Sequence, residues 1–129
     1  MCPQLINRFI VQEHHATHLH WDFRLEKDGV LKSWAVPKGP PEEKGMKRLA
    51  IQVEDHELSY ISFEGTIPDG QYGAGTVKIW DQGTYETESD LSAKSDSPKR
   101  IVFKIKGKRL KGRYSLVHLK EKQWLLIKL

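Results

Sequence analysis

Residues Leu19–Glu26 read LHWDFRLE, and the alternation of side chains in this stretch decides the fold class. In a β-strand, successive side chains point to opposite faces. One face of this stretch is then apolar: Leu19, Trp21, Phe23 and Leu25. The other face is entirely polar: His20, Asp22, Arg24 and Glu26. We therefore expect a strand with one face in the core and with an imidazole, a carboxylate and a guanidinium in a row on the other.

The same period-two pattern recurs along most of the chain, and helical periodicity is scarce. Turn signals rich in Gly, Pro and Asp separate the predicted strands, which are Phe9–His14, Leu19–Glu26, Leu31–Val36, Leu49–His56, Thr76–Trp80, Ile101–Lys106, Tyr114–Leu119 and Trp124–Leu129. Short helical pieces are predicted around Glu42–Met46 and Glu57–Phe63, and a mobile loop over the polar stretch 87–98. Short strands in this number fit a barrel or a sandwich. The expected fold class is mainly β, a compact antiparallel β-barrel of about eight strands with short flanking helices.

Length and composition indicate a globular single domain over residues 1–129. Hydrophobic residues make up 38% of the chain and charged residues 29%. No apolar run approaches the roughly 20 residues of a membrane span, and the N-terminus does not resemble a signal peptide, so a cytoplasmic location is expected. The single cysteine, Cys2, excludes an internal disulfide, and any metal would be held by histidine and carboxylate.

Basic residues gather in the C-terminal part of the chain. Residues 99–129 contain eleven Lys or Arg against one acid, Glu121, whereas the whole chain has a net charge of only +4. Such a segment is typical of a footprint for phosphate backbones, but also of a solvated lysine-rich face on antiparallel strands. Charge alone does not choose between the two.

Histidines cluster beside the polar row, in the stretch HHATHLH. Two strands joined by a short turn would bring His14 back over His20 and Asp22. Two imidazoles and one carboxylate leave coordination positions open, which suits Mn²⁺, Fe²⁺ or Zn²⁺ in a catalytic site. We predict His14, His20 and Asp22 as metal ligands, and we assign no ligand role to His15 or His18.

A second polar cluster lies in LAIQVEDHELSY, residues Leu49–Tyr60. The alternation predicts an apolar core face made of Leu49, Ile51 and Val53. It also predicts a polar face made of Gln52, Glu54 and His56. If this polar face shares a cavity with the first row, His56 and Glu54 lie near Arg24. A histidine titrates near neutrality, so His56 would bind phosphate or act as a general acid.

These motifs are long enough to name a family. They are FIVQEHHATHLHWDFRLEKDGVLKSWAVPKGP, KRLAIQVEDHELSY and FEGTIPDGQYGAGTVKIWDQGTY, with the pattern H-x5-H-x-D-x-R followed by V-E-D-H-x3-Y. In them the chain resembles the 3′-phosphoesterase domain of bacterial DNA ligase D and its free-standing archaeal and bacterial relatives. The resemblance runs from Phe9 to the terminal QWLLIKL. It implies one 3′-phosphoesterase domain over residues 1–129: a β-barrel that binds Mn²⁺ and acts on 3′-phosphate and 3′-ribonucleotide ends in repair.

The resemblance also implies roles for individual residues. His14, His20 and Asp22 match the family's metal ligands. Catalytic positions fall on Arg24, Glu54, His56 and Tyr60. Positions that bind phosphate or substrate fall on Gln12, Arg24, Lys38, Arg48, His56 and Tyr60. Both a neighbouring 2′-OH and a metal-bound water stay open as the nucleophile.

The chain departs from the family pattern at its ends. It carries no polymerase or ligase module, and it begins just before Phe9. The expected partners are therefore nucleic-acid 3′ ends, in DNA or in a DNA–RNA primer-template, and separate ligase and polymerase chains, with no membrane. Removal of a terminal ribonucleoside is expected to depend more on the N-terminal segment of other family members than removal of phosphate does.

Two other classes of function compete with this interpretation. A non-haem iron oxygenase could use His20, Asp22 and either His56 or His118, but it would leave Arg24 and the basic segment without roles. A non-catalytic nucleic-acid-binding barrel would use the basic segment and leave the His-Asp-Arg row unexplained. Metal-dependent release of phosphate from a 3′-phosphorylated oligonucleotide separates all three classes.

Overall fold

The computed structural model describes residues 7–71, 74–90 and 99–129. Within these ranges the chain forms nine strands and one short 3₁₀ helix. The elements are β1 (Asn7–His15), β2 (Leu19–Lys27), β3 (Val30–Val36), β4 (Lys47–His56), η1 (Leu58–Ser62), β5 (Gly65–Ile67), β6 (Gly75–Asp90), β7 (Arg100–Lys106), β8 (Lys111–Lys120) and β9 (Gln123–Lys128).

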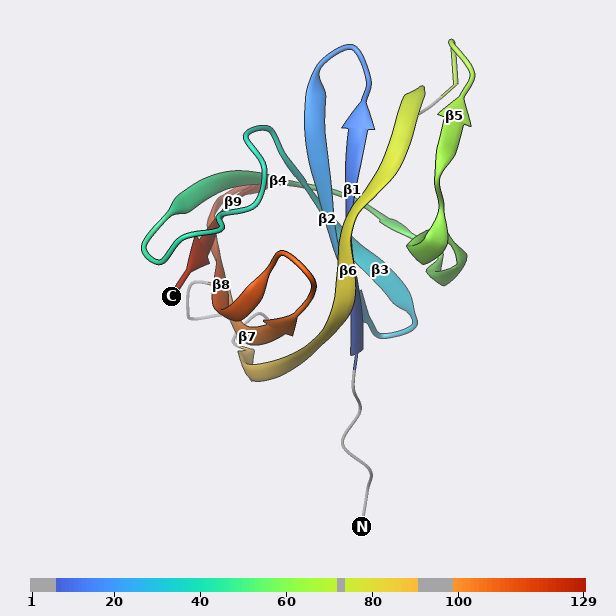
Figure 1. The fold of residues 1–129 in the computed structure, drawn as a ribbon. Helices are drawn as coiled ribbons and strands as arrows, with labels where there is room; N and C mark the ends of the chain where they lie inside the picture. Colours follow the sequence, from blue (N-terminus) through green and yellow to red (C-terminus); the bar gives the residue numbers. More distant parts are fainter. Residues whose placement is uncertain (1–6, 72–73, 91–98) are drawn as a thin grey trace.

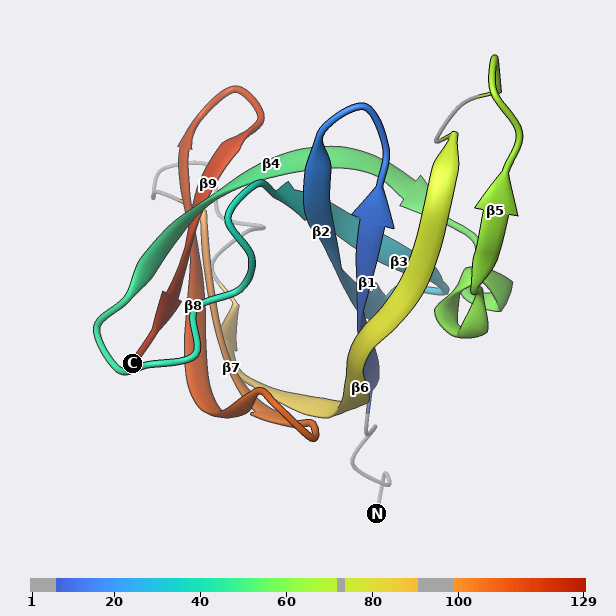
Figure 2. The same ribbon diagram turned by 45° about the horizontal axis from the view of Figure 1, so that its top comes forward.

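The strands form a closed antiparallel barrel (Figure 1). Their order is β1-β2-β3-β4-β9-β8-β7-β6, and pairing of β1 with β6 closes the ring. The short strand β5 pairs with β6 and lies outside the ring, as Figure 2 shows. The predicted eight-stranded barrel is therefore confirmed. Strand β5 was not predicted, because its three residues are too few to show a periodic pattern.

The hairpin of β2 and β3 sets the register of the wall that carries the site. Its turn residues Asp28 and Gly29 have φ angles of 53° and 82°. Positive φ at both positions is what a two-residue type I′ turn requires, and Asp-Gly supplies it. With Lys27 opposite Val30, this turn places Arg24 directly across from Ser33.

Strand β6 is far longer than the predicted strand Thr76–Trp80. It pairs with β1 from Thr76 to Tyr85 and with β7 from Thr84 to Asp90. The sequence Asp81-Gln82-Gly83 in its middle resembles a turn and hid this continuity. Gly83 is needed there because a Cβ atom would lie 2.0 Å from the Lys106 carbonyl oxygen. The predicted loop over 87–98 is wrong for residues 87–90, which are strand, and residues 91–98 lie outside the described residues.

The two helical predictions had different outcomes. The piece predicted at Glu57–Phe63 is confirmed as η1. The piece predicted at Glu42–Met46 is wrong, because this segment forms bends and a turn. Gly45 there has a φ angle of 85°, and its N–H donates to the Lys128 carbonyl of β9 and not within a helix. In the part of the chain described, no helix is long and apolar enough to cross a membrane.

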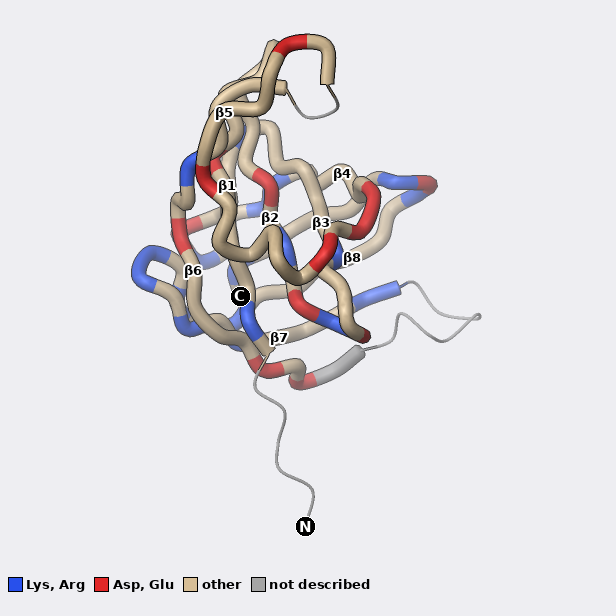
Figure 3. The backbone as a smooth tube through the Cα atoms, turned by 90° about the vertical axis from the view of Figure 1, so that its right-hand side faces the viewer, with Lys and Arg blue, Asp and Glu red and all other residues tan. Residues whose placement is uncertain are grey.

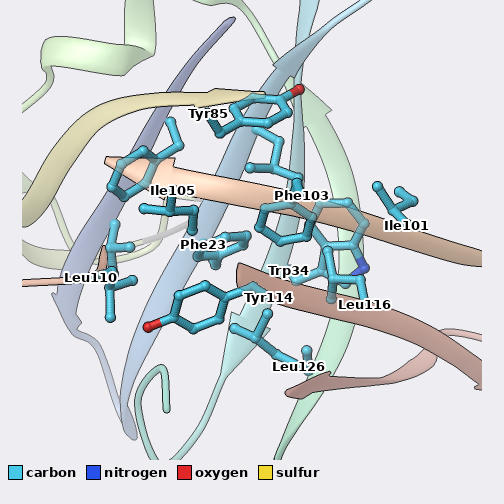
Figure 4. Packing of buried hydrophobic residues seen from close by; sticks show 14 of the residues in the cluster. Phe23, Trp34, Tyr85, Ile101, Phe103, Ile105, Leu110, Tyr114, Leu116 and Leu126 are labelled. Atoms are coloured by element: carbon cyan, nitrogen blue, oxygen red, sulfur yellow. The ribbon is translucent and has the colours of Figure 1, made fainter. Parts of the chain in front are cut away.

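The barrel interior is filled by large apolar side chains from opposite walls (Figure 4). Phe23 of β2 packs near Phe103 of β7, with ring centroids 6.1 Å apart. The Tyr114 hydroxyl donates to the Pro41 carbonyl and so ties the β3–β4 connection to β8. The apolar face predicted for LHWDFRLE points into this core from Trp21 to Leu25, whereas Leu19 is 44% exposed.

Strand β4 has the opposite orientation to the predicted one. Ala50 is fully buried, and the Gln52 side chain accepts a hydrogen bond from the Trp124 indole at 3.1 Å. Leu49 is 44% exposed on the other face. The predicted alternation assigned each side chain of this strand to the wrong face. The reason is that apolar residues also occur on the outer face of β4, where Val53 lines a pocket.

Candidate active site

A cluster of two histidines and one aspartate lies on the outer face of the β1–β2 hairpin. His14 and His20 are directly opposite each other, and Asp22 lies one step further along the same face. The His14 Nδ1 atom is 3.2 Å from His20 Nε2 and 3.4 Å from Asp22 Oδ2. His20 Nε2 is 3.2 Å from Asp22 Oδ1, and the three donor atoms all lie within 4.8 Å of one another.

Backbone carbonyls fix the tautomers of both imidazoles. His14 Nε2 lies 3.2 Å from the Ala74 carbonyl oxygen, and His20 Nδ1 lies 3.1 Å from that of His18. A carbonyl can only accept, so these two nitrogens carry the protons of the neutral rings. The nitrogens that face the cluster are then bare. Two lone pairs and a carboxylate turned toward one another favour a cation between them, and carbonyls that accept from the far ring nitrogen orient metal-bound histidines in this way.

Asp22 is ionised at neutral pH in this setting. Burial of the carboxyl favours its neutral form, but the His20 imidazole and the Arg24 guanidinium outweigh burial and hold the Asp22 pKa below its ordinary value. When the His20 ring is charged, its Nε2–H donates to the Asp22 carboxylate, and this hydrogen bond raises the pKa of His20. The cluster therefore presents a negative charge to any cation that enters it.

Arg24 is held rigidly beside the cluster although it is buried. Its Nε donates to the Gln12 side chain at 2.7 Å, and its Nη1 donates to the Ser33 hydroxyl at 2.8 Å. Its Nη2 lies 3.4 Å from Asp22, and its guanidinium carbon lies 4.9 Å from the centre of the Tyr60 ring. This many partners fix a planar cation in one orientation, as recognition of a phosphate requires.

His56 joins this group through a bulge between β3 and β4. Ser33 pairs with Val53 whereas Leu31 pairs with His56, so two steps on β3 match three on β4. The extra residue turns His56 to the face on which Val53 already lies. The His56 ring then contacts both Arg24 and Tyr60, the latter with ring centroids 4.9 Å apart.

The contact with Arg24 also sets the protonation state of His56. His56 Nδ1 lies 2.9 Å from Arg24 Nη1 and 3.1 Å from the Glu54 carbonyl oxygen. The contact with Arg24 is the shorter and a guanidinium can only donate, so we assign Nδ1 as the acceptor from Arg24 and place the proton on Nε2. Burial and then the charge of Arg24 lower the pKa of His56. Burial also raises the pKa of the neighbouring Tyr60. At neutral pH the site thus holds an uncharged imidazole donor and an uncharged phenol beside a fixed guanidinium.

These side chains line one open pocket of about 520 Å³. The His-His-Asp cluster lies on its wall, and so do Arg24, His56 and Tyr60. The remaining wall comes from the β1–β2 turn, from β3 and β4, and from the segment that carries β5. The pocket thus brings together six predicted site residues: His14, His20, Asp22, Arg24, His56 and Tyr60.

The other predicted site residues lie elsewhere. The Glu54 side chain is exposed and does not line the pocket; only its carbonyl oxygen lies near His56, 3.1 Å from Nδ1. Lys38 and Arg48 line a different cavity, at the end of the barrel where Trp21 lies. His118 of β8 bonds the Glu121 carbonyl and is not on the pocket wall, which removes it from an oxygenase site with His20.

Gln12 supports the site from beneath. It is fully buried, its side-chain oxygen accepts from Arg24, and its amide nitrogen donates to the carbonyls of Tyr60 and Phe63 at 3.0 and 3.1 Å. Both ends of the amide are therefore used to join Arg24 to η1. Gln12 does not line the pocket, so its place in the structure is that of a support for Arg24.

Sequence reasoning missed three supporting groups. Ser33 is buried and holds Arg24, and the carbonyls of Ala74 and His18 orient the two histidines. The Asp-Gly turn could have revealed Ser33, because a two-residue hairpin at Asp28 places it opposite Arg24. Every residue has a backbone carbonyl, so the sequence holds no signal for the two carbonyls that orient the histidines.

Replacing Gln12 by Leu should destabilise the protein and slow its reaction. The change removes the partner that Gln12 gives to the Arg24 Nε and to the Phe63 carbonyl, whereas the Tyr60 carbonyl keeps the Phe63 N–H. One unsatisfied buried group costs about 1–3 kcal/mol. Urea denaturation should show a loss of at least that size. The exposed Gln82 provides the matched control as Gln82→Leu, which should change stability by less than about 0.5 kcal/mol. Equal stability of the two variants would contradict the supporting role of Gln12.

The family model described as the DNA ligase D 3′-phosphoesterase domain matches residues 12–118, a range that contains the whole pocket cluster. The chain belongs to the DNA ligase D 3′-phosphoesterase family. The resemblance stated from the motifs is confirmed.

Curated relatives support this membership in the DNA ligase D 3′-phosphoesterase family. A multifunctional non-homologous end joining protein LigD from Mycolicibacterium smegmatis is 48% identical over 124 residues, which cover 92% of this chain and 16% of the relative. The protein of that name from Pseudomonas aeruginosa is 50% identical over 125 residues, covering 94% of this chain and 15% of the relative. The chain thus spans about one sixth of the length of these relatives.

Proposed function

We propose that the chain is a metal-dependent phosphoesterase that removes 3′-phosphate and 3′-terminal ribonucleoside groups from DNA or RNA strand ends during repair. The observation that carries this proposal is the single pocket in which a His-His-Asp cluster adjoins the fixed guanidinium of Arg24 and the imidazole of His56. Family membership supports 3′-end chemistry, and the names of the relatives support a place in end joining.

The donor set of the cluster fits a divalent transition metal. Two bare imidazole nitrogens and one carboxylate face each other on a wall of an open pocket, so ligand positions remain for substrate and water. We propose Mn²⁺, held by His14, His20 and Asp22. When bound, the ion would supply Lewis-acid stabilisation of charge on phosphoryl oxygens.

The remaining side chains would bind and orient the phosphate. Arg24 would neutralise phosphoryl charge from a position its buried partners fix in advance, which is the form of electrostatic stabilisation that lowers a barrier most. The neutral His56 would donate from Nε2 to a phosphoryl or leaving oxygen. Tyr60 would keep its phenolic proton, since its pKa is raised, and would add one donor.

A second subsite for the strand is proposed at the end of the barrel. Lys38, Arg48 and Arg109 line a cavity of about 350 Å³ there together with Glu42 and Glu43, so three cations outnumber two carboxylates, and the Arg109 guanidinium lies over the Trp80 ring at 4.6 Å. The Arg48 Nε and the Trp21 Nε1 are buried without a hydrogen-bond partner in the described residues. Unsatisfied donors among cations favour an anion, so we assign Lys38 and Arg48 to a phosphate of the bound strand.

The test is metal-dependent release of inorganic phosphate from a DNA oligonucleotide with a 3′-phosphate. A second substrate with one 3′-terminal ribonucleotide tests release of the ribonucleoside, and its 2′-deoxy counterpart shows whether the 2′-OH is needed. Mn²⁺ should activate both reactions and a chelator should stop them. Binding of the oligonucleotide without turnover at any metal concentration would leave a binding barrel as the function.

The basic C-terminal segment is predicted to add substrate affinity and not chemistry. Figure 3 shows Lys and Arg gathered on the hairpin that joins β7 to β8. Lys106 and Lys111 are exposed and directly opposite each other there, although like charges in that position destabilise a sheet. Lys104, Lys108 and Lys120 are exposed as well, whereas Arg113 is paired with Glu88 at 2.7 Å.

The double variant Lys106→Gln/Lys111→Gln should raise KM on duplex DNA several-fold and leave kcat unchanged. The slope of log affinity against log salt should become shallower by about 0.9 for each phosphate that a lysine no longer neutralises. The control is Lys44→Gln/Lys122→Gln, which removes the same charge from exposed positions elsewhere. If both double variants behave alike, the hairpin serves solubility only.

A further inference from the structure

Asp81 of β6 is a buried carboxylate that the proposed reaction does not use. It is 3% exposed, and both of its oxygens accept hydrogen bonds from backbone N–H groups. Oδ1 accepts from Gln82 at 2.9 Å and from Lys108 at 2.8 Å. Oδ2 accepts from Arg109 at 3.1 Å and from Leu110 at 2.8 Å. Three successive N–H groups of the loop between β7 and β8 therefore point at one carboxylate of a different strand.

This carboxylate determines the shape of the loop. The Gly107 N–H donates to the Leu110 carbonyl at 2.9 Å and closes the loop beside the Asp81 oxygens. A Cβ atom on Gly107 would lie 2.5 Å from Asp81 Oδ2, so only glycine lets the carboxylate come this close. Hydrogen bonds from N–H groups to a carboxylate are stronger than those between neutral groups. The loop is therefore held in one conformation before any ligand binds.

A bulge in β6 places a tryptophan beside this carboxylate. Neighbouring residues of β1 pair with Ile79 and Asp81, so Trp80 between them is an extra residue. Such a bulge turns a side chain away from the direction that strict alternation would give it. The half-buried Trp80 ring packs against the core and lines the cavity at the end of the barrel. The ring thus offers a flat surface next to the loop.

Asp81 and Trp80 together fix the position of Arg109. Asp81 holds its backbone N–H, and the guanidinium lies over the Trp80 ring, 4.6 Å from the ring centre. Arg109 is nevertheless exposed, and in the described parts of the chain no carboxylate lies within ion-pair distance of it. The exposed arginines Arg8 and Arg113 differ, because each of them pairs with a glutamate. The Arg109 charge is thus held in place without an ionic partner there.

The position of Arg109 brings it close to other cations. The cavity that Arg109 lines is also lined by Lys38 and Arg48, with Glu42 and Glu43 as the acidic members of its wall. An exposed cation that is free to move turns into solvent, away from like charges. Here a buried carboxylate and an aromatic ring hold the third cation at the cavity. This arrangement favours an anionic ligand that several cations share, as the phosphates of a strand are.

We propose that Arg109 binds a backbone phosphate of the substrate strand and that Asp81 is the positioning residue that holds it there. This inference rests on the strand subsite of the proposed phosphoesterase function and adds both residues to it. A guanidinium that is already ordered loses little freedom on binding, so its contact with phosphate adds affinity. Asp81 itself touches neither the strand nor the reacting atoms.

The test of Arg109 measures binding of a fluorescent DNA duplex with a single-stranded 3′ overhang that ends in a 3′-hydroxyl. This end carries no group to release, so affinity is measured without turnover, by anisotropy over a range of salt. Arg109→Gln should weaken binding about five-fold or more and lower the salt slope by about 0.7, the effect of one phosphate of a single strand. The control is Arg113→Gln, whose affinity should stay within about two-fold of the parent protein, because Arg113 is paired with Glu88.

Asp81→Asn tests the positioning role. The amide nitrogen donates where the second carboxylate oxygen accepts, so some of the four N–H groups lose their acceptor. The loop should then no longer hold Arg109 on Trp80, and the loss of affinity should approach that of Arg109→Gln. In the double variant Asp81→Asn/Arg109→Gln, the loss should not exceed that of Arg109→Gln alone, because Asp81 acts through Arg109. A merely structural role would make the two losses add.

Hydrogen exchange in the parent chain keeps the test decisive if Asp81→Asn does not fold. Lys108 and Arg109 are exposed residues of a loop, and their N–H groups would exchange quickly with solvent unless Asp81 held them. By NMR of the ¹⁵N-labelled chain without DNA, they should exchange as slowly as the N–H groups of β8.

Four results would overturn the proposal. They are parent-like affinity in Arg109→Gln, an equal loss in Arg109→Gln and Arg113→Gln, additive losses in the double variant, and fast exchange of the loop N–H groups. Failure of the phosphoesterase function would look different, since the chain would then bind the 3′-hydroxyl DNA through Arg109 and release no phosphate from any 3′ end. Release of phosphate together with parent-like affinity in Arg109→Gln would keep that function and remove this inference.

Discussion

Asp22→Asn is expected to abolish phosphoesterase activity and to remove most of the Mn²⁺ affinity while the barrel stays folded. The change preserves the shape of the side chain but deletes the negative charge of Asp22, which faces the two imidazoles. Loss of a hydrogen-bond partner behind a metal ligand already weakens metal binding by about 10–100-fold. Loss of a charged ligand itself should exceed that range. His14→Ala and His20→Ala should have the same outcome.

Calorimetric titration with Mn²⁺ and the phosphate-release assay measure the two effects, and thermal unfolding followed by circular dichroism reports the fold. His15→Ala is the control, since that imidazole is exposed and pairs with Glu13 at 2.8 Å, away from the cluster. It should be close to the parent protein in all three measurements. Parent-like Mn²⁺ affinity in Asp22→Asn would show that the ion binds elsewhere.

Arg24→Lys should separate the phosphate-binding group from the metal cluster. The guanidinium reaches Gln12, Ser33 and His56 through its Nε and Nη1 atoms, and an ammonium cannot span these positions. We expect Mn²⁺ affinity within a few-fold of the parent protein. The rate should fall by about 10²-fold or more, as when one preorganised charge contact to a transition state is removed.

The control for this prediction is Arg8→Lys, on the neighbouring strand. Arg8 is exposed and pairs with Glu26 at 2.9 Å, so it is outside the pocket. Single-turnover rates at saturating Mn²⁺ compare the two variants, and urea denaturation reports the stability lost when Gln12 and Ser33 lose their partner. Loss of Mn²⁺ binding in Arg24→Lys would make Arg24 part of the metal site.

The sequence predicted the β1–β2 half of the pocket well because that half is local. Alternation in LHWDFRLE places His20, Asp22 and Arg24 on one face, and a short turn returns His14 to them. These relations depend only on strand geometry and on a connection of a few residues. The carbonyls that orient the imidazoles have no such signal, because Ala74 reaches His14 only through the tertiary fold.

The β4 half was predicted with the wrong geometry. Alternation alone put Val53 in the core and His56 on the opposite face, whereas Val53 lies on the outer face and a bulge against β3 turns His56 to that same face. A bulge shifts the parity of every residue beyond it, and nothing in LAIQVEDHELSY marks its position. The same limit explains β6, whose polar centre resembles a turn until pairing with β1 on one side and β7 on the other is known.

Closure of the ring by β1 and β6 also determines how the protein must fold. This pairing joins Asn7 to Tyr85, residues 78 positions apart. Contacts between residues so far apart in the sequence form late and slowly, because loop-closure entropy opposes them until the rest of the sheet has formed. The β1–β2 hairpin, by contrast, joins neighbours in the chain. We therefore expect the His-His-Asp hairpin to form early, and high-affinity metal binding to appear only when β6 docks and brings the Ala74 carbonyl to His14.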